Sequence, residues 1–284
     1  MRVTAVGCSG SYPGPESPAS CYLVQAEHEG RTWSIVLDLG NGSLGTLQRY
    51  IEPTTLDAVV LSHLHPDHCL DVCSLYVMLA HHPVLAREGR LPVYGPRGVT
   101  ERMARAYGVE AAEDLGARYE FAEFCDGAQV EVGPFTLTPV RVYHPVETYG
   151  VRVAADGAVL AYTGDTDACP ALDVLMRDAD LVLADSAFVE GRDAAEGIHM
   201  SGRRAALAAV SAGGVKRLVL THIPSWNDVE VTRAEAEPLW PGVEVCRPGD
   251  VFEVVGAGAM RIPLGHDPTR RPSRRPAPRH PHHP

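Results

Sequence analysis

Short apolar runs separated by turn residues dominate the chain, and this pattern indicates strands more often than long helices. Helical spacing follows Asp67, through Leu70, Leu75 and Leu79, and recurs after Arg97. After residue 162 the pattern becomes helix, strand, helix, strand. Such a mixed order predicts an α/β fold in which helices cover two sheets. The strand-like runs are residues 2–6, 21–26, 33–37, 58–61, 129–132, 135–143, 149–153 and 158–162.

One loop contains an unusual density of metal-binding side chains. Residues 63–68 read His-Leu-His-Pro-Asp-His and directly follow the apolar run 58–62. His63 and His65 alternate by one residue, so both can reach one ion, whereas Asp67 and His68 lie a turn further on and suit a second ion. The alternative is a solvent-facing cap, but surface histidines rarely cluster with an aspartate in this way. The loop therefore predicts two adjacent metal ions.

Three later residues that suit a metal each follow a strand-like run. His144 follows residues 135–143, Asp165 follows 159–162, and His222 follows 218–221. Strand ends that open into one loop region hold ligands rigidly. Taken singly, His144 also suits a turn, Asp165 a helix cap or Asx turn, and His222 an apolar core. Together with residues 63–68, they supply the ligands that a two-metal site needs.

The order His63-X-His65-X-Asp67-His68, then His144, Asp165 and His222, resembles the metallo-β-lactamase superfamily over nearly all of residues 1–255. This resemblance implies an αββα sandwich in a single domain, with the site at the edge of the sandwich. Residues 144–152, the Tyr-Thr-Gly-Asp-Thr segment and 199–201 resemble the ribonuclease Z branch of phosphodiesterases. Residues 7–11, 14–20 and 37–40 are similar to actinobacterial cyclic-nucleotide phosphodiesterases of that branch.

The resemblance also implies how the ligands divide between two divalent ions. Imidazoles and carboxylates suit zinc, and manganese or iron(II) are the alternatives, because such ligands discriminate weakly. Two adjacent ions lower the pKa of a shared water to give a hydroxide near neutral pH, and they neutralise phosphate oxygens. This is the chemistry of a phosphodiester or ester hydrolase. By resemblance, one ion is held by His63, His65 and His144, the other by Asp67, His68 and His222, and Asp165 bridges them.

The leaving alkoxide of a phosphodiester needs a proton from a group outside the metal ligands. His199 is the predicted general acid, because it precedes the helical stretch 203–210 and can lie at the entrance of that helix. Asp185 occupies the place where ribonuclease Z relatives have a glutamate that orients this histidine, and it is one methylene shorter. The alternatives are a surface or capping histidine and an ordinary strand-end aspartate. With the ligand Asp67, these residues form the predicted catalytic set.

Two glycine-rich segments, residues 7–14 and 40–43, offer backbone N–H groups that can bind a phosphate. The second segment lies at the start of a predicted helix through Leu47 and Tyr50. A tight strand exit is the commoner use of such glycines. Ser43 is the predicted substrate contact from this region.

Composition fits one globular domain, with 284 residues, 45% hydrophobic and 21% charged. No apolar run approaches the roughly 18 residues that span a membrane. The chain enters a strand-like run at once, so we expect no signal peptide. Seven cysteines without a C-x-x-C pair do not suggest a disulfide framework. We therefore expect a cytoplasmic protein without a membrane partner, and the sequence leaves a homodimer open.

The charge of the chain is unevenly distributed. Residues 263–284 are rich in Pro, Arg and His, and we expect them to be a disordered tail beyond a folded domain of residues 1–262. The net charge is −11 although the tail has five arginines against Asp267, so the domain is still more acidic than the whole chain. Enzymes that bind a long polyanion usually have a basic surface. The acidic domain favours a small substrate over a long nucleic acid.

The residues and the resemblance together predict hydrolysis of 3′,5′-cyclic nucleotides, cyclic AMP to 5′-AMP. A metal hydroxide attacks phosphorus and His199 protonates the ribose 3′ oxygen. The main alternative is a ribonuclease Z-like tRNA 3′-processing endonuclease. Such enzymes have a long arm between the positions of His144 and Asp165, where this chain has 20 residues. Relatives in which a partner subunit donates the arm keep this alternative open.

The loop near the amino terminus also departs from the tRNA-processing pattern. The basic Pro-x-Lys-x-Arg-Asn sequence of those enzymes is replaced by Pro-Glu-Ser-Pro-Ala-Ser at residues 15–20. Another ester or thioester hydrolase of the same fold is a lesser alternative. A non-catalytic metal-binding scaffold is disfavoured, because every ligand and the predicted acid are present.

Overall fold

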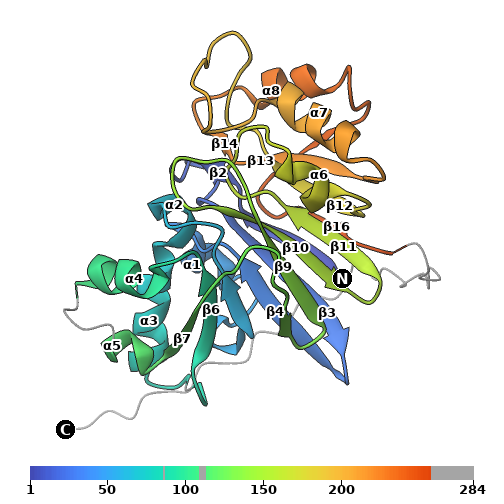
Figure 1. The fold of residues 1–284 in the computed structure, drawn as a ribbon. Coiled ribbons are helices and arrows are strands. Elements are labelled where there is room, and N and C mark those ends of the chain that lie inside the picture. Colours follow the sequence, from blue (N-terminus) through green and yellow to red (C-terminus); the bar gives the residue numbers. More distant parts are fainter. Residues whose placement is uncertain (86, 109–112, 257–284) are drawn as a thin grey trace, which may run out of the picture.

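Two seven-stranded sheets form the centre of the molecule (Figure 1). The computed structural model describes residues 1–85, 87–108 and 113–256. One sheet has the order β16-β1-β3-β4-β5-β6-β7 and the other β15-β13-β12-β11-β10-β9-β8, while β14 and β2 form a separate pair. The tail predicted at residues 263–284, and the boundary at residue 262, lie outside the described residues.

All eight strands predicted from the apolar runs are present, with ends that differ from the prediction by at most two residues. The first sheet contains β1 (Arg2–Gly7), β3 (Cys21–His28), β4 (Arg31–Leu37), β5 (Ala58–Val60), β6 (Leu91–Gly95), β7 (Tyr119–Glu123) and β16 (Val251–Glu253). The second contains β8 (Val130–Val132), β9 (Phe135–Arg141), β10 (Tyr149–Ala155), β11 (Ala158–Tyr162), β12 (Leu181–Asp185), β13 (Leu218–Thr221) and β15 (Glu244–Val245). The separate pair is β2 (Ser9–Gly10) and β14 (Ile223–Pro224).

Helices cover the outer faces of the two sheets (Figure 1). On the first sheet these are α1 (Ser43–Leu47), η1 (Pro53–Thr55), α2 (Pro66–Cys69), α3 (Asp71–His81), α4 (Val99–Tyr107) and α5 (Glu113–Gly116). On the second sheet they are α6 (Ala171–Met176), α7 (Gly202–Ala212) and α8 (Val229–Ala236). Within the described part of the chain, no helix has both the length and the apolar character to cross a bilayer.

Period-2 alternation along the strands divides the apolar side chains into three buried clusters. In β11, Leu160 and Tyr162 belong to the cluster between the sheets, whereas Ala161 belongs to the cluster under α6 and α7. In β5, Val60 belongs to the cluster between the sheets and Val59 to the cluster under α3 and α4. Each sheet is therefore buried on both faces, which makes the fold the αββα sandwich expected from the resemblance.

Parallel pairing determines where the chemistry-bearing loops open. β4, β5, β6 and β7 are parallel neighbours in the first sheet, and β11, β12 and β13 are parallel neighbours in the second. The carboxyl ends of parallel strands lie at the same edge of a sheet, where ligands of open α/β sheets bind. The segments after β4, β5, β11, β12 and β13 therefore meet at one edge of the sandwich.

The helix predicted from Asp67 onward is interrupted in the structure. α2 ends at Cys69 and α3 begins at Asp71, because the Asp71 N–H donates to the carbonyl of Leu39 at 3.1 Å. The Leu39 N–H in turn donates to the His68 carbonyl at 2.8 Å. A continuous helix would have used both groups internally. The segment after β4 thus sets the direction of α2, which holds Asp67 and His68.

The cluster between the sheets buries apolar side chains of both sheets and so contributes to the stability of the fold. Replacing the fully buried Leu160 by alanine should lower the free energy of unfolding by ~2–5 kcal/mol, because it removes apolar contacts and leaves a cavity. Val174→Ala, at a side chain that is 65% exposed, is the matched control and should stay within about 0.5 kcal/mol of the parent. Denaturant unfolding measures both variants, and equal losses would contradict the placement of Leu160 in the core.

Candidate metal centre

All seven side chains predicted as ligands meet at the edge where the strand ends open. Each residue offers one ligand atom, and within each of two groups these atoms lie within 4.8 Å of one another. Asp165, the predicted bridge, belongs to both groups. The first group is His63, His65, His144 and Asp165, and the second is Asp67, His68, Asp165 and His222.

In the first group, three imidazole nitrogens point into one small space. His63 Nε2 lies 3.0 Å from His65 Nδ1, and His144 Nε2 lies 3.4 Å from the same atom. Asp165 Oδ2 lies 3.5 Å from His63 Nε2. His63 Nδ1 faces Ser62 Oγ and His144 Nδ1 faces the Ile198 carbonyl, so in the neutral rings both Nε2 atoms present lone pairs to this space. A cation that accepts such lone pairs fits this donor set.

In the second group, buried polar atoms lack a hydrogen-bond partner. These atoms are His68 Nε2, His222 Nε2 and Asp165 Oδ1. His68 Nε2 approaches Asp165 Oδ1 to 3.2 Å, and His222 Nε2 approaches Asp165 Oδ2 to 3.3 Å, yet neither contact has hydrogen-bond geometry. An unsatisfied buried polar atom costs about 1–3 kcal/mol. A metal ion coordinated by these atoms would remove that cost, so the second group also fits a metal.

The ring nitrogen that does not face the centre is held by a second partner in four of the histidines. Such partners orient the ring, fix the tautomer and strengthen metal binding. The hydrogen bonds at these four Nδ1 atoms therefore support metal binding through the Nε2 atoms. The pairs are His63 Nδ1 with Ser62 Oγ at 3.1 Å, His68 Nδ1 with Asp38 Oδ2 at 2.7 Å, His144 Nδ1 with the Ile198 carbonyl at 2.8 Å, and His222 Nδ1 with Ser20 Oγ at 3.0 Å.

Asp38 is the functional residue to which the sequence analysis gave no role. Its fully buried carboxylate accepts from the Ser62 N–H at 2.7 Å, the Ser62 hydroxyl at 2.8 Å, His68 Nδ1 at 2.7 Å and the Tyr162 hydroxyl at 2.6 Å. Its φ is 60°, a strained value for a residue with a side chain. Asp38 directly follows β4, so its place at a strand end, the signal that found the ligands, could have marked it as well.

Burial holds most of the ligand imidazoles in the neutral state. It lowers the pKa of His63 well below the ordinary histidine value, and it lowers the pKa of His65, His144 and His222. A neutral imidazole is the form that coordinates a metal. These four side chains are therefore ready to ligate at neutral pH.

His68 and its carboxylate neighbours show that the centre favours positive charge. Burial opposes a charge on His68, but Asp165, Asp38 and Asp67 together raise its pKa well above the ordinary value. Burial also opposes the charge on Asp165, yet His222, His68 and His63 hold its pKa well below the usual range. The potential that attracts a proton to His68 attracts a metal cation to the same place.

His199, the predicted general acid, lies beside both ligand groups. The ring centroid of His199 is 5.5 Å from that of His144 and 5.3 Å from that of His222. His199 Nδ1 is hydrogen-bonded to Asp185 Oδ2 at 2.9 Å, as the sequence analysis predicted for this pair. Burial disfavours its charge, but Asp185 raises the pKa of His199 to about 9. The imidazole is thus protonated at neutral pH.

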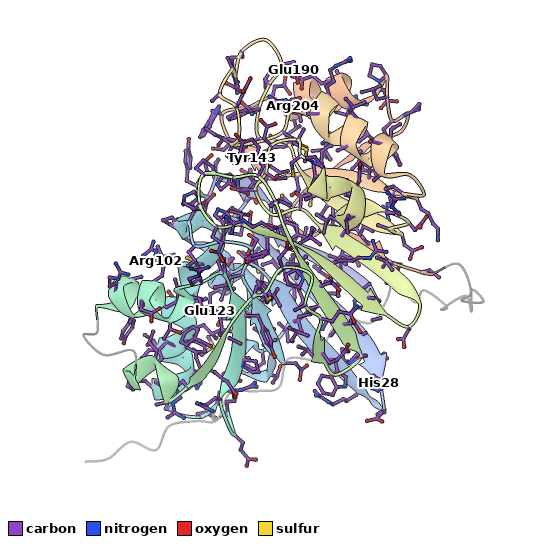
Figure 2. All side chains as sticks on the ribbon, in the orientation of Figure 1. His28, Arg102, Glu123, Tyr143, Glu190 and Arg204 are labelled. Atoms are coloured by element: carbon purple, nitrogen blue, oxygen red, sulfur yellow. The ribbon has the colours of Figure 1, made fainter. Side chains whose placement is uncertain are left out.

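The loop that presents His199 is anchored at several points. Asp185 also accepts from the N–H groups of Thr166 at 3.0 Å and Ala187 at 3.1 Å, so it is itself fixed. Asp167 Oδ2 accepts from the Gly197 N–H at 2.8 Å. Figure 2 shows Arg204 beside Glu190 at this end of the molecule, where Arg204 Nη1 donates to Asp167 Oδ1 at 2.6 Å.

The structure places Ser43 away from the role predicted for it. Ser43 is fully buried, and its hydroxyl donates to the Gly40 carbonyl at 2.6 Å. The preceding Gly42 has φ 84° and precedes α1 without a side-chain cap. The hydroxyl therefore closes its own turn and is not presented to a substrate. The glycine segment at residues 40–43 is a tight strand exit, which was the alternative interpretation.

The fold and the ligand set agree with a comparison against known families. Residues 34–223 match the family described as a β-lactamase superfamily domain. The chain belongs to this superfamily. Its αββα sandwich, with histidine and aspartate ligands at one edge, is the metallo-β-lactamase fold.

Several relatives match almost the whole chain. The Mycobacterium tuberculosis protein named Uncharacterized protein Rv1339 is 39% identical over 265 residues, which span 91% of the chain and 94% of that protein. YhfI of Bacillus subtilis, named a probable metallo-hydrolase, is 30% identical over 255 residues, spanning 89% of the chain and 100% of YhfI. Ribonuclease Z of Myxococcus xanthus is 26% identical over 310 residues, spanning 89% and 98%.

The crystal structure of YhfI, a metallo-β-lactamase fold protein, superposes on the chain with a TM-score of 0.78 at 28% identity, covering 88% of the chain and 98% of YhfI. The matching family, these relatives and the metal-binding groups together assign the chain to the metal-dependent hydrolases of this fold.

The role of Asp38 can be tested through metal affinity. Asp38→Asn should weaken metal binding about 10- to 100-fold, because an amide nitrogen cannot accept the donors that now meet at this carboxylate and His68 loses its orientation. Zinc titration of the metal-free protein against a competing chelator gives the affinity. Asp57→Asn is the matched control, since Asp57 bonds the Ser34 N–H and Arg31 instead of a ligand. Equal affinities in the two variants would contradict a positioning role for Asp38.

Proposed function

We propose that the chain is a binuclear metal-dependent phosphodiesterase that hydrolyses 3′,5′-cyclic nucleotides and converts cyclic AMP to 5′-AMP. The observation that supports this proposal most is the position of His199. It is a cationic imidazole, oriented by Asp185, beside two ligand groups that share one carboxylate. A general acid beside two metals suits a substrate whose leaving group is a poor alkoxide.

The two ligand groups would hold the divalent ions, which would supply an acidified water and positive charge for the phosphate oxygens. His199 Nδ1 donates a hydrogen bond to Asp185 and keeps its proton. Nε2 is therefore the nitrogen that can give a proton to the substrate. The acceptor is the ribose 3′ oxygen as its bond to phosphorus breaks. Asp185 keeps the tautomer and stabilises the charged ring before the transfer, as the carboxylate of a catalytic triad does.

The segment between His144 and Asp165 supports a small substrate. Its 20 residues hold β10 and β11, which pair directly through Ala155 and Ala158. The turn between these strands is Asp156 and Gly157, with φ values of 50° and 73°. The segment therefore contains no projecting arm. The chain has a net charge of −11, which disfavours a long polyanion and tolerates a substrate with a single phosphodiester.

A tRNA 3′-processing endonuclease is the second candidate. The similarity to ribonuclease Z of Myxococcus xanthus favours it. The acidic charge and the two-residue turn at Asp156 disfavour it. Both candidates share the phosphodiester chemistry of the site and differ in the size of the substrate.

We propose the cytoplasm as the location, because seven free thiols suit a reducing compartment.

A direct comparison of substrates tests the proposal. The zinc- or manganese-loaded full chain should convert cyclic AMP to 5′-AMP and should leave a precursor tRNA intact, because the chain lacks the arm and the basic loop that would bind the RNA. Chromatography resolves the nucleotides and gel electrophoresis the RNA. Asp165→Asn, which removes the shared carboxylate charge, is the negative control. Cleavage of the RNA alone would sink the proposal in favour of the second candidate.

Loss of the general acid should depend on the leaving group. His199→Ala should retain both metals but lose about 10²- to 10⁴-fold in kcat for cyclic AMP. A p-nitrophenyl phosphodiester should be affected far less, because its leaving group needs no proton. His28→Ala is the control, since His28 lies at the opposite end of the molecule (Figure 2). Elemental analysis and kinetics on both substrates are the measurements. An equal loss on both substrates would exclude proton donation by His199.

A further inference from the structure

Two exposed aromatic side chains contact each other at the edge of the sandwich where the metal centre lies. The ring centroids of Tyr12 and Trp226 are 5.2 Å apart, with an angle of 43° between the planes. The side chains are 47% and 54% exposed. Both partners of this ring contact are therefore open to solvent. Two adjacent exposed rings offer flat faces on which a planar ligand can stack.

Tyr12 is held by an unusual turn. Ser11 has a φ of 64°, and the Tyr12 N–H donates to the Gly10 carbonyl at 2.7 Å, which is the hydrogen bond of a rare, strained γ-turn. The Ser9 hydroxyl donates to the Tyr12 carbonyl at 2.7 Å, and this second hydrogen bond stabilises the turn. Strain of this kind persists where the surrounding structure enforces it, and it clusters at ligand sites.

Trp226 is fixed in a similar way. The Asn227 N–H donates to the Pro224 carbonyl at 2.9 Å, which closes a turn with Trp226 inside it. The Asn227 side chain bonds the Ala187 carbonyl at 2.8 Å. Since Ala187 follows Asp185 by two residues, the turn that presents Trp226 is tied to the segment that orients His199. Both rings are thus presented by backbone that is ordered before any ligand binds.

The aromatic pair is continuous with the metal centre. β2 and β14 are parallel, with Ser9 opposite Ile223 and Gly10 opposite Pro224. A Cβ on Gly10 would lie 3.0 Å from Cδ2 of the His222 ring and 2.2 Å from the His222 carbonyl, so only glycine allows this approach. Trp226 is four residues beyond His222, which limits their Cα separation to at most about 14 Å. The two segments that present the pair therefore meet at His222 of the second ligand group.

We infer that Tyr12 and Trp226 form the stacking surface for the nucleobase of the substrate, and this inference rests on the proposed cyclic-nucleotide function. The metals and His199 account for the phosphate and the 3′ oxygen, which leaves the planar base without a partner. An aromatic ring binds any base by stacking, without a positive charge. Such a surface suits an acidic protein, in which a neutral contact adds affinity for a nucleotide but not for polyanions in general.

Kinetics on variants of the full chain test this role. Trp226→Ala should raise KM for cyclic AMP about tenfold and leave kcat little changed, because it removes a base contact and no reacting group. Tyr12→Ala should act in the same direction, and Trp226→Phe should restore most of the loss, since it retains an aromatic face. Val174→Ala, at a side chain of α6 that is 65% exposed, should match the parent.

Binding without turnover separates this inference from the proposed function. In calorimetry with the zinc-loaded chain, 5′-AMP should bind about tenfold more tightly than ribose 5-phosphate, which lacks the base, and Trp226→Ala should abolish that preference. Equal binding of the two ligands to the parent, or a preference that survives Trp226→Ala, would overturn the stacking role. A preference that depends on Trp226, found in a protein that does not hydrolyse cyclic AMP, would support the base site and count against the proposed function alone.

Discussion

The carboxylate of Asp165 is shared by two groups of imidazoles at the edge where parallel strands of both sheets end, and the arrangement around it depends on that sharing. Asp165 is 2% exposed, and one of its oxygens has no hydrogen-bond partner. A buried carboxylate of this kind is stable only if positive charge lies close to it. Metal binding would therefore contribute to the stability of the fold as well as to catalysis, because the ions bind the folded site and not the unfolded chain.

The strained backbone of the site follows from the same requirement. His222 has a φ of 57° and Asp38 a φ of 60°, both in the left-handed region that disfavours residues with a side chain. Each residue directly follows a strand whose core side chains fix its position, so the strain is imposed by well-packed sheet. A sharp turn of the chain at these points directs the imidazole of His222 and the carboxylate of Asp38 into the centre. If the strands continued in extended conformation, the two side chains would point elsewhere.

The ligand set could be predicted from the sequence because its two signals, an apolar run and a ligand-type residue directly after it, are close together in the chain. Ligand-type residues followed apolar runs at short range, and parallel pairing then brought the strand ends to one edge. Apart from Asp38, the partners of those ligands were not predictable in this way, since Ser20 meets His222 across 202 positions of the chain and Ile198 meets His144 across 54. Ser43 was misassigned for a related reason, because no sequence pattern reveals that its hydroxyl is used by the carbonyl of Gly40. The break before α3 likewise comes from a contact with Leu39, which helical spacing cannot register.

The loops around the centre are connected to one another, and this links the parts of the proposed reaction. β2 pairs with β14, so the segments of Tyr12 and His222 lie together, and Asn227 joins the β14 segment to the loop after Asp185. A shift of the turn that presents Trp226 would therefore reach the segment directly after Asp185, the residue that is hydrogen-bonded to His199. Proton transfer to a leaving oxygen tolerates little misplacement, since positional errors of about 1 Å cost about a hundredfold in rate. A rigid link between the proposed base contact and the proposed general acid would thus favour substrates in which base, ribose and phosphate form one compact unit.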